Sequence, residues 1–284
     1  MGHMKTDQML QKIKVAIKRK LEYENHLKNL DKAKTLIKKG NLLSLAMEQN
    51  SDLDWKAIIF DVKKGLLKFA LNSTVDTLPT NANLVQWGKR MSDKCKNCGG
   101  KETLLHILNY CKTSLDQDRF TWRHDNILNY VYNTIDKSRF EIYVDLEEKK
   151  SGYASTIPPE IMVTSEKPDI VIVDRKSKKV HIFELTVPFE TNIEKQHEYK
   201  QNKYAHFEQD IEAEVIAFEI GSRGYISPEN RTRLNKSHGL SQKGIKFKII
   251  LFNLTALSLN SSYYIYLNRK EPQWMSPLPL KAIF

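Results

Sequence analysis

Cysteine is scarce in this chain, with only three among 284 residues. So small and odd a number argues against a disulfide framework and favours a reducing nuclear or cytosolic setting. No run of about 18 apolar residues occurs, so a membrane-spanning helix is not expected, and no secretory signal is found at the start. Internal repeats and low-complexity tracts are missing as well. These absences argue against disulfide-rich secreted proteins, membrane proteins and repeat proteins.

The composition that remains favours a folded, basic protein. Hydrophobic residues make up 40% of the chain, and a length of 284 residues allows compact units with apolar cores. Lysine and arginine total 45 against 34 acidic residues, which gives a net charge of +11 and an isoelectric point near 9.3. A basic surplus of this size favours a polyanionic partner, for which nucleic acid or an acidic membrane are the usual candidates.

The N-terminal part of the chain has the pattern of helices. Residues 1–4 are predicted to be a cloning remnant. Apolar residues recur at helical spacing over 5–39, which predicts one long amphipathic helix or a broken pair that ends near Gly40. Its basic surplus fits either a solvated face or an arm that faces nucleic acid. A second helix is predicted over 51–67, and Thr80 is predicted to cap a short third one.

The C-terminal half mixes strands with helices. A helix is predicted from Asp118 to Ile135, followed by a polar loop or weak strand over 145–167. The predicted strands are Asp169–Asp174, Val180–Val187, Glu214–Ile220 and Lys246–Leu254, and the predicted helices are Ile193–Ile211, Pro228–Leu234 and Leu257–Leu267. This succession predicts an α+β fold with a mixed sheet flanked by helices.

All three cysteines lie between positions 95 and 111, together with a histidine. Cys95, Cys98, His106 and Cys111 follow the spacing C-x2-C-x7-H-x4-C. Zinc binds four such ligands in a tetrahedron, and a complete set of four leaves no open position for catalysis. The spacing therefore predicts a structural zinc site. The alternative is three structural cysteines beside a surface histidine.

The segment from 167 to 187 has the pattern of a β-hairpin with basic residues at its turn. A turn centred between Lys176 and Ser177 places Asp169 directly opposite Glu184, with β-carbons about 5 Å apart. Two carboxylates at that distance repel each other unless a cation lies between them, and Mg²⁺ or Mn²⁺ with oxygen ligands meets that need. The alternative is that either acid simply ends a strand in solvent.

The helix that follows the hairpin offers a basic side chain. Lys200 lies on the apolar stripe of this helix, which is formed by Ile193, His197, Tyr204, Phe207 and Ile211. A lysine in such a stripe needs an anionic partner if it is buried. Lys200 is therefore predicted either to extend outward into solvent or to point at the two carboxylates and a phosphate.

These motifs together resemble a known family. Pro168-Asp169 with Glu184-Leu185-Thr186 resembles the PD-(D/E)XK nuclease pattern, except that Thr186 stands where a lysine is usual. In the endonucleases of site-specific non-LTR retrotransposons that lysine comes from the next helix. Over residues 60–235 the chain resembles these proteins in the order Leu78-Pro79-Thr80, Trp87-Gly88-Lys89-Arg90, the cysteine and histidine segment, Trp122-Arg123-His124-Asp125, His197-Glu198-Tyr199-Lys200, Asn202-Lys203-Tyr204 and Phe218–Gly224.

The resemblance implies a division of the chain and a role for its site residues. It implies a helical linker region (5–90), a zinc knuckle (91–115) and a restriction-like endonuclease domain (116–284). It also implies that Mg²⁺ or Mn²⁺ is held by the two acids and a backbone carbonyl near Leu185, and that a lysine orients or deprotonates the attacking water. The catalytic residues implied are Asp169, Glu184, Lys200, Lys203 and Tyr204, and those implied to bind nucleic acid are Arg123, His124 and Arg223.

The resemblance also implies partners and a biological setting. The parent protein would nick double-stranded target DNA in the nucleus to prime reverse transcription, with the element RNA and a reverse transcriptase domain of the same polypeptide as partners. The residue pattern leaves His124 open to another interpretation, as a satisfied core histidine on one helix face. Two rival functions also stay open: an inactive nucleic-acid-binding module with a nuclease fold, which Thr186 would permit, and a structural zinc-bearing interaction domain.

Overall fold

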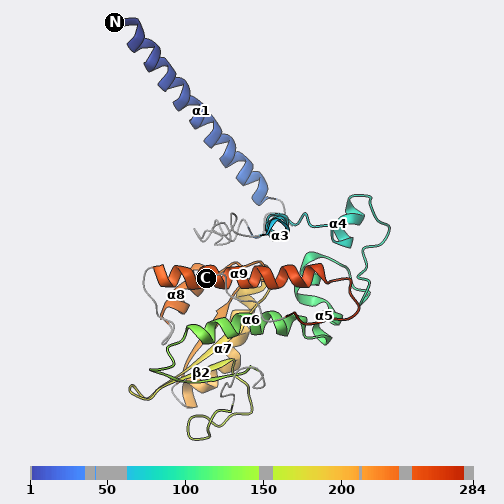
Figure 1. Ribbon diagram of the computed structural model, residues 1–284, viewed down its shortest axis with the longest axis vertical. Coiled ribbons are helices and arrows are strands. Elements are labelled where there is room, and N and C mark those ends of the chain that lie inside the picture. The colour runs from blue at the N-terminus through green and yellow to red at the C-terminus, as the bar shows by residue number, and fades with distance from the viewer. Residues whose placement is uncertain are drawn as a thin grey trace.

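The computed structural model describes residues 2–35, 42, 63–146, 156–210, 213–236 and 245–277 (Figure 1). Over these ranges the fold is α+β, as predicted, with helices around a four-stranded mixed sheet. The helices are α1 (Gly2–Lys34), α3 (Lys64–Thr74), α4 (Asn81–Gln86), α5 (Lys112–Asp116), α6 (Arg119–Thr134), α7 (Ile193–Asp210), α8 (Pro228–Lys236) and α9 (Ile245–Leu267). The strands are β1 (Glu141–Val144), β2 (Ile170–Asp174), β3 (Lys179–Thr186) and β4 (Glu214–Glu219), and two short helical turns are η2 (His106–Tyr110) and η4 (Glu190–Asn192).

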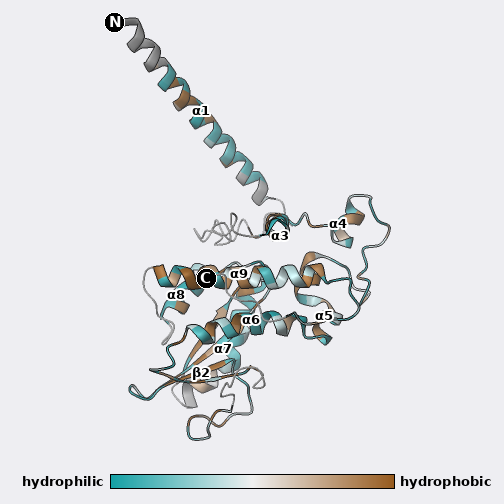
Figure 2. Cartoon of the chain, viewed as in Figure 1, coloured by the Kyte–Doolittle hydropathy of each residue, from teal (hydrophilic) through white to brown (hydrophobic). Residues whose placement is uncertain are grey.

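Helix α1 is a single long helix, not a broken pair, and it extends away from the rest of the chain (Figure 1). Its apolar side chains Met9, Ile13, Ile17 and Leu21 are exposed. Figure 2 shows that α1 is mainly hydrophilic, whereas the strands and α9 carry many hydrophobic residues. The predicted stop at Gly40 and most of the helix predicted over 51–67 lie outside the described residues.

The sheet has the order β1-β2-β3-β4, with β1, β2 and β3 antiparallel and β4 parallel to β3. Ile170 pairs with Phe183, which is the register predicted for the hairpin. One step further along this register places Asp169 opposite Glu184. The turn of the hairpin is stabilised by Asp174, whose carboxylate accepts hydrogen bonds from the backbone amides after it.

Helices cover both faces of the sheet. Ile170 and Ile172 of β2 pack in a core with α6, α8 and α9, whereas Val171 and Val173 pack in a second core with Tyr204 and Phe207 of α7. This division follows the two-residue alternation of strand side chains. As a result, α6 and α7 approach the open end of the β2–β3 hairpin, opposite its turn, from opposite faces of the sheet. The two predicted acids, Asp169 and Glu184, lie at this open end.

Two elements differ from the prediction. The strand predicted over Lys246–Leu254 is wrong, because these residues belong to α9, which runs unbroken to Leu267. Helix α9 is buried on most of its circumference, so it lacks the one-sided periodicity that identifies a helix, and its β-branched start has the pattern of a strand. Strand β1 was not predicted; its four residues lie between the predicted helix and the predicted loop.

Residues 95–111, which carry the three cysteines and His106, are called the cysteine segment below. Helix α3, the cysteine segment and α9 share one apolar core. Leu66 and Phe69 of α3 pack there with Leu104 and Ile107 of the cysteine segment and with Ala256 of α9. The predicted cap at Thr80 is confirmed, since its side chain accepts a hydrogen bond from the Asn83 amide at the start of α4. Within the described residues, no helix is both long enough and apolar enough to cross a bilayer.

Candidate functional site

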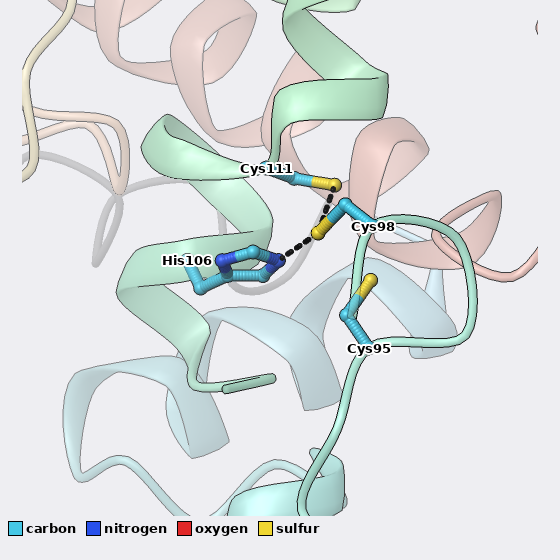
Figure 3. A group of neighbouring side chains, drawn as sticks. All are labelled: Cys95, Cys98, His106 and Cys111. Carbon is cyan, nitrogen blue, oxygen red and sulfur yellow. Dashed lines mark hydrogen bonds between the residues drawn. The ribbon is translucent and has the colours of Figure 1, made fainter. Parts of the chain in front are cut away.

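The four predicted zinc ligands converge (Figure 3). The sulfur and nitrogen ligand atoms of Cys95, Cys98, His106 and Cys111 all lie within 4.8 Å of one another. The Cys98 sulfur is 3.8 Å from the Cys111 sulfur and 3.3 Å from the His106 Nε2 atom. Ligands about 2.3 Å from a tetrahedral zinc ion are about 3.8 Å apart, so the observed spacing is compatible with a structural zinc site.

The local backbone explains why these residues meet. Cys95 and Cys98 lie on a tight turn, in which the Cys95 amide donates to the Gly100 carbonyl and the Gly99 amide donates to the Cys95 carbonyl. Gly99 has a φ of +73°, a conformation that glycine adopts without strain. At Gly100 a β-carbon would lie 2.9 Å from the His106 ring, so only glycine leaves room for that ligand.

The cysteine segment is docked onto the C-terminal end of α9 and the chain beyond it. The Asn97 side chain donates to the backbone carbonyls of Arg269 and Glu271. Arg119, which is buried at the start of α6, donates to the carbonyls of Asn268 and Glu271. Through these bonds the four candidate metal ligands, α6 and the end of α9 depend on one another. Loss of a zinc ion bound there would therefore loosen more than the cysteine turn itself.

A second constellation lies at the edge of the sheet where β2 begins and β3 ends. The Asp169 amide donates to Glu184 Oε1 at 3.0 Å, and the Leu185 amide donates to Asp169 Oδ2 at 2.7 Å. From α7, Lys200 Nζ donates to Glu184 Oε2 at 2.6 Å. Of the two orientations predicted for Lys200, the structure therefore shows the one that points at the carboxylates. All three side chains are largely buried.

The electrostatics of this constellation differ from one acid to the other. Burial and the neighbouring charge of Asp169 raise the pKa of Glu184. Burial also acts to raise the pKa of Asp169, but hydrogen bonding and charge from His124, with the charge of Lys200, outweigh it, so that this pKa is lowered. Burial acts to lower the pKa of Lys200, and the charges of Glu184 and Asp169 outweigh it and raise that pKa.

His124 reaches Asp169 from the opposite face of the sheet. Its Nε2 atom lies 3.3 Å from Asp169 Oδ2 and 3.3 Å from the Leu185 carbonyl oxygen, and its Nδ1 atom lies 3.1 Å from Asp125 Oδ1. Burial acts to lower the pKa of His124, but the hydrogen bonds and charges of Asp125 and Asp169 outweigh it and raise the pKa to about 10. His124 is thus in contact with the candidate site and is not an inert core histidine.

Lys203 and Tyr204 lie next to this site on α7. Lys203 Nζ donates to the Tyr204 hydroxyl at 2.8 Å and lies 3.7 Å from Glu166. Burial, together with the charge of Glu184, raises the pKa of Tyr204. The tyrosine is buried, whereas Lys203 is partly exposed, so the lysine is the member of this pair that an incoming phosphate could reach.

The oxygen donors at this edge fit a hard divalent cation. Asp169 and Glu184 supply carboxylates, and Leu185 adds a backbone carbonyl. The Asp169 Oδ2 atom and the Leu185 carbonyl oxygen both face His124 Nε2, each at 3.3 Å. Carboxylate and carbonyl oxygens are the ligands that Mg²⁺ and Mn²⁺ take in proteins.

Arg123 and Arg223, both predicted to bind nucleic acid, are buried instead. Arg123 donates to the Ser262 hydroxyl and to the Val187 carbonyl, and burial lowers its pKa to about 10. Arg223 donates to Glu190 at 2.7 Å and to the Ser73 carbonyl. These contacts link helices and loops inside the fold and place both guanidinium groups away from the surface. This placement does not fit the predicted role in contacting a phosphate backbone.

Glu190 was not predicted from the sequence, yet it is the buried partner of Arg223. At Gly221 a β-carbon would lie 2.5 Å from the Glu190 carboxylate, so a glycine is needed there. Asp125, the partner of His124, belongs to the Trp122–Asp125 motif but was not predicted as a site residue. The sequence signal for Asp125 is its position directly after His124, but a single sequence carries no comparable signal for Glu190.

Replacing Glu190 tests the structural role of Arg223. Glu190→Ala leaves a buried guanidinium without its carboxylate, so the free energy of unfolding should fall by about 3–5 kcal/mol. Urea denaturation would measure this change. The control is Asp116→Ala, which removes an exposed ion pair with Lys112 of similar length and should leave the unfolding midpoint almost unchanged. Equal effects of the two substitutions would contradict the role assigned to Arg223.

Comparison with known proteins adds no assignment. No family model matches this chain, and no curated protein sequence matches it significantly.

Proposed function

We propose that this protein is a metal-dependent DNA endonuclease whose active site is formed by Asp169, Glu184 and Lys200. The observation that carries this proposal is the 2.6 Å contact between Lys200 Nζ and Glu184 Oε2 beside Asp169 at the edge of the sheet. Two carboxylates and a lysine around one point form the set that hydrolysis of a phosphodiester needs.

The chain's own residues supply most of the chemistry. Asp169 and Glu184 would hold the divalent ion, with the Leu185 carbonyl as a further ligand. When bound, that ion supplies positive charge where negative charge develops on the phosphate. Lys200, whose raised pKa keeps it charged, would orient the water that attacks in line rather than deprotonate it, and Lys203 would contact the phosphate from the same helix, with Tyr204 beside it. Burial of the acids strengthens these interactions, because the local dielectric is lower than that of water.

The position of Lys200 favours this function over the inactive binding module. Thr186 occupies the β3 position where a lysine is usual, and on its own it would leave the site without a cation. Lys200 reaches Glu184 from α7 and provides the charge that Thr186 cannot. The acid pair and its lysine also argue against a purely structural zinc domain, since such a domain has no need for a buried Lys–Glu–Asp cluster.

The wider role in our proposal rests on the family resemblance and on charge. The protein would nick one strand of double-stranded target DNA in the nucleus, so that the exposed 3′ hydroxyl primes reverse transcription of a non-LTR retrotransposon RNA. A reverse transcriptase domain of the same polypeptide would carry out the synthesis. The net charge of +11 supports a nucleic-acid partner. The structural zinc ion would hold the cysteine segment against α6 and α9.

A plasmid nicking assay tests this proposal. The zinc-loaded protein should convert supercoiled plasmid to the open circle with added Mg²⁺ or Mn²⁺, and should not do so without added divalent ion. Omission is preferable to a chelator, because a chelator would also remove zinc. Fluorescence anisotropy with labelled duplex DNA measures binding without the added ion. Tight binding with no nicking under any ion would favour the inactive module, and neither binding nor nicking would favour the structural domain.

Three single substitutions on α7 test which lysine acts in the reaction. Lys200→Ala should lower the nicking rate at saturating DNA by about 10²–10³-fold, because it removes a charge preorganised next to the phosphate. Lys203→Ala should mainly weaken DNA binding and lower its salt dependence by about one contact. Lys195→Ala is the control, since its side chain is exposed on the same helix. A near-normal rate for Lys200→Ala would remove this residue from the mechanism.

A further inference from the structure

His124 has a geometry that a core histidine does not need. Its Nε2 atom lies at the same distance, 3.3 Å, from a carboxylate oxygen of Asp169 and from the carbonyl oxygen of Leu185. Both distances are longer than the usual N–H···O hydrogen bond of about 2.9 Å. Ligands about 2.2 Å from one ion and at right angles to each other are about 3.1 Å apart. Nε2 is thus spaced from each of the two oxygen atoms like neighbouring ligands of one ion.

The other ring nitrogen supports the same interpretation. Nδ1 lies 3.1 Å from Asp125 Oδ1, so Asp125 can accept its proton. Histidines that bind metals usually donate their second ring N–H to a carboxylate or a carbonyl, which fixes the tautomer and turns the free lone pair toward the ion. Without an ion, Nε2 can carry a proton that the two oxygen atoms accept. A divalent ion would take the place of that proton, because metal binding to histidine releases it.

The contacts of both ring nitrogens therefore support the same role: Nδ1 faces Asp125, and Nε2 faces Asp169 and the Leu185 carbonyl. The side chain of His124 is about three-quarters buried, with a relative exposure of 23%, so this geometry is held by packing and is not a chance surface contact. Helix α6 supplies the imidazole from the face of the sheet opposite to α7, which supplies Lys200. Lysine and histidine thus reach the acid pair from two sides without competing for one position.

We infer that His124 is a ligand of the divalent ion, through Nε2, together with Asp169 and the Leu185 carbonyl, and that this nitrogen makes the centre select Mn²⁺ over Mg²⁺. Mg²⁺ is a hard ion that prefers oxygen ligands, whereas an imidazole nitrogen suits first-row transition ions. The inference rests on the proposed function, because it assigns a further ligand to the same centre. It changes the role of His124 from a contact with nucleic acid to a contact with the ion.

Pulsed electron paramagnetic resonance of Mn²⁺ bound to the full chain tests this inference directly. The zinc site is first filled with diamagnetic Zn²⁺, so that only the second centre takes up Mn²⁺. Wild-type protein should show electron spin-echo modulation from a coordinated ¹⁴N nucleus, and this should change to a ¹⁵N pattern when histidine is labelled with ¹⁵N. The measurement needs no substitution and no activity, so it remains decisive even where a variant fails to fold.

Calorimetry with His124→Asn completes the test. Asparagine keeps a polar group near Asp125 but cannot extend to the Nε2 position. The affinity of the His124→Asn protein for Mn²⁺ should fall by about tenfold or more, with a much smaller change for Mg²⁺. The nitrogen modulation should vanish. His197→Asn is the matched control. His197 lies on α7 and also contacts a buried carboxylate, since its Nδ1 atom is 3.0 Å from Glu219 of β4. This variant should leave the affinity for Mn²⁺ and the modulation unchanged.

Asp169→Asn separates the two proposals. In one outcome Asp169→Asn does not bind Mn²⁺, wild-type protein shows no nitrogen modulation and His124→Asn binds Mn²⁺ normally. That outcome would overturn the assignment of His124 and leave the proposed function standing. Wild-type affinity for Mn²⁺ in Asp169→Asn would instead overturn the proposed metal centre itself. Loss of binding in Asp169→Asn together with the expected modulation supports both.

Discussion

Asp169→Asn and Glu184→Gln are each expected to lower plasmid nicking to the background of the assay. Both substitutions keep the size of the side chain and remove a negative charge that would hold the divalent ion. Without that charge the ion is bound weakly, and the charge developing on the phosphate is not offset. The rate should therefore fall by more than the roughly 10²–10³-fold expected for loss of a single preorganised donor such as Lys200.

Both variants should also be less stable than the wild type, which provides an internal check. Glu184→Gln removes the hydrogen-bonded anion of the buried Lys200, which keeps only the charge of Asp169, so the unfolding midpoint should drop. Asp169→Asn removes an anion that His124 and Lys200 stabilise, as its lowered pKa indicates, so its unfolding midpoint should drop as well. Glu194→Gln is the control for activity, because its side chain is exposed on α7. Folded variants of both acids that nick at the wild-type rate would show that the active site lies elsewhere.

The hairpin and the convergence of the three cysteines with His106 could be predicted because their constraints are local. The register of β2 and β3 follows from the position of the turn, and it fixes Asp169 opposite Glu184 before any tertiary contact is known. The four predicted zinc ligands lie close together in sequence, and Gly99 and Gly100 directly follow the turn that carries Cys95 and Cys98. In both cases short-range geometry decides which side chains meet.

The remaining features depend on packing that a sequence period does not encode. Helix α9 is buried on most sides, so the sequence pattern of its first residues resembles that of a strand. Its packing against α3 and α6 is what favours a helix. Arg123 and Arg223 have the residue type of a phosphate contact, but their environment makes them internal links. His124 lies on an apolar stripe of α6, and only the fold shows that this stripe ends at Leu185 and Asp169.

Substitution of a zinc ligand should have the largest effect on stability. Wild-type protein is expected to contain one zinc ion per chain, and Cys98→Ser should contain less than half an equivalent by elemental analysis. The Cys98 sulfur contacts both His106 and Cys111, so its loss removes the central ligand of the group. Zinc binding at structural sites contributes about 10–16 kcal/mol, which is comparable to the whole stability of a typical domain.

The structure also predicts where the damage from Cys98→Ser spreads. The cysteine segment shares an apolar core with α3 and α9, and Asn97 holds the chain that follows α9. Amide hydrogen exchange should therefore rise in α3, in η2 and around Arg269, while the β2–β3 hairpin keeps more of its protection. Lys96→Ser is the matched control, since Lys96 is exposed on the same turn between the two cysteines. It should keep its zinc, its melting temperature and its exchange pattern. A Cys98→Ser protein that melts and exchanges like Lys96→Ser would show that these cysteines do not hold a structural metal, because removal of a true ligand from a site this closely tied to the core cannot leave the core unchanged.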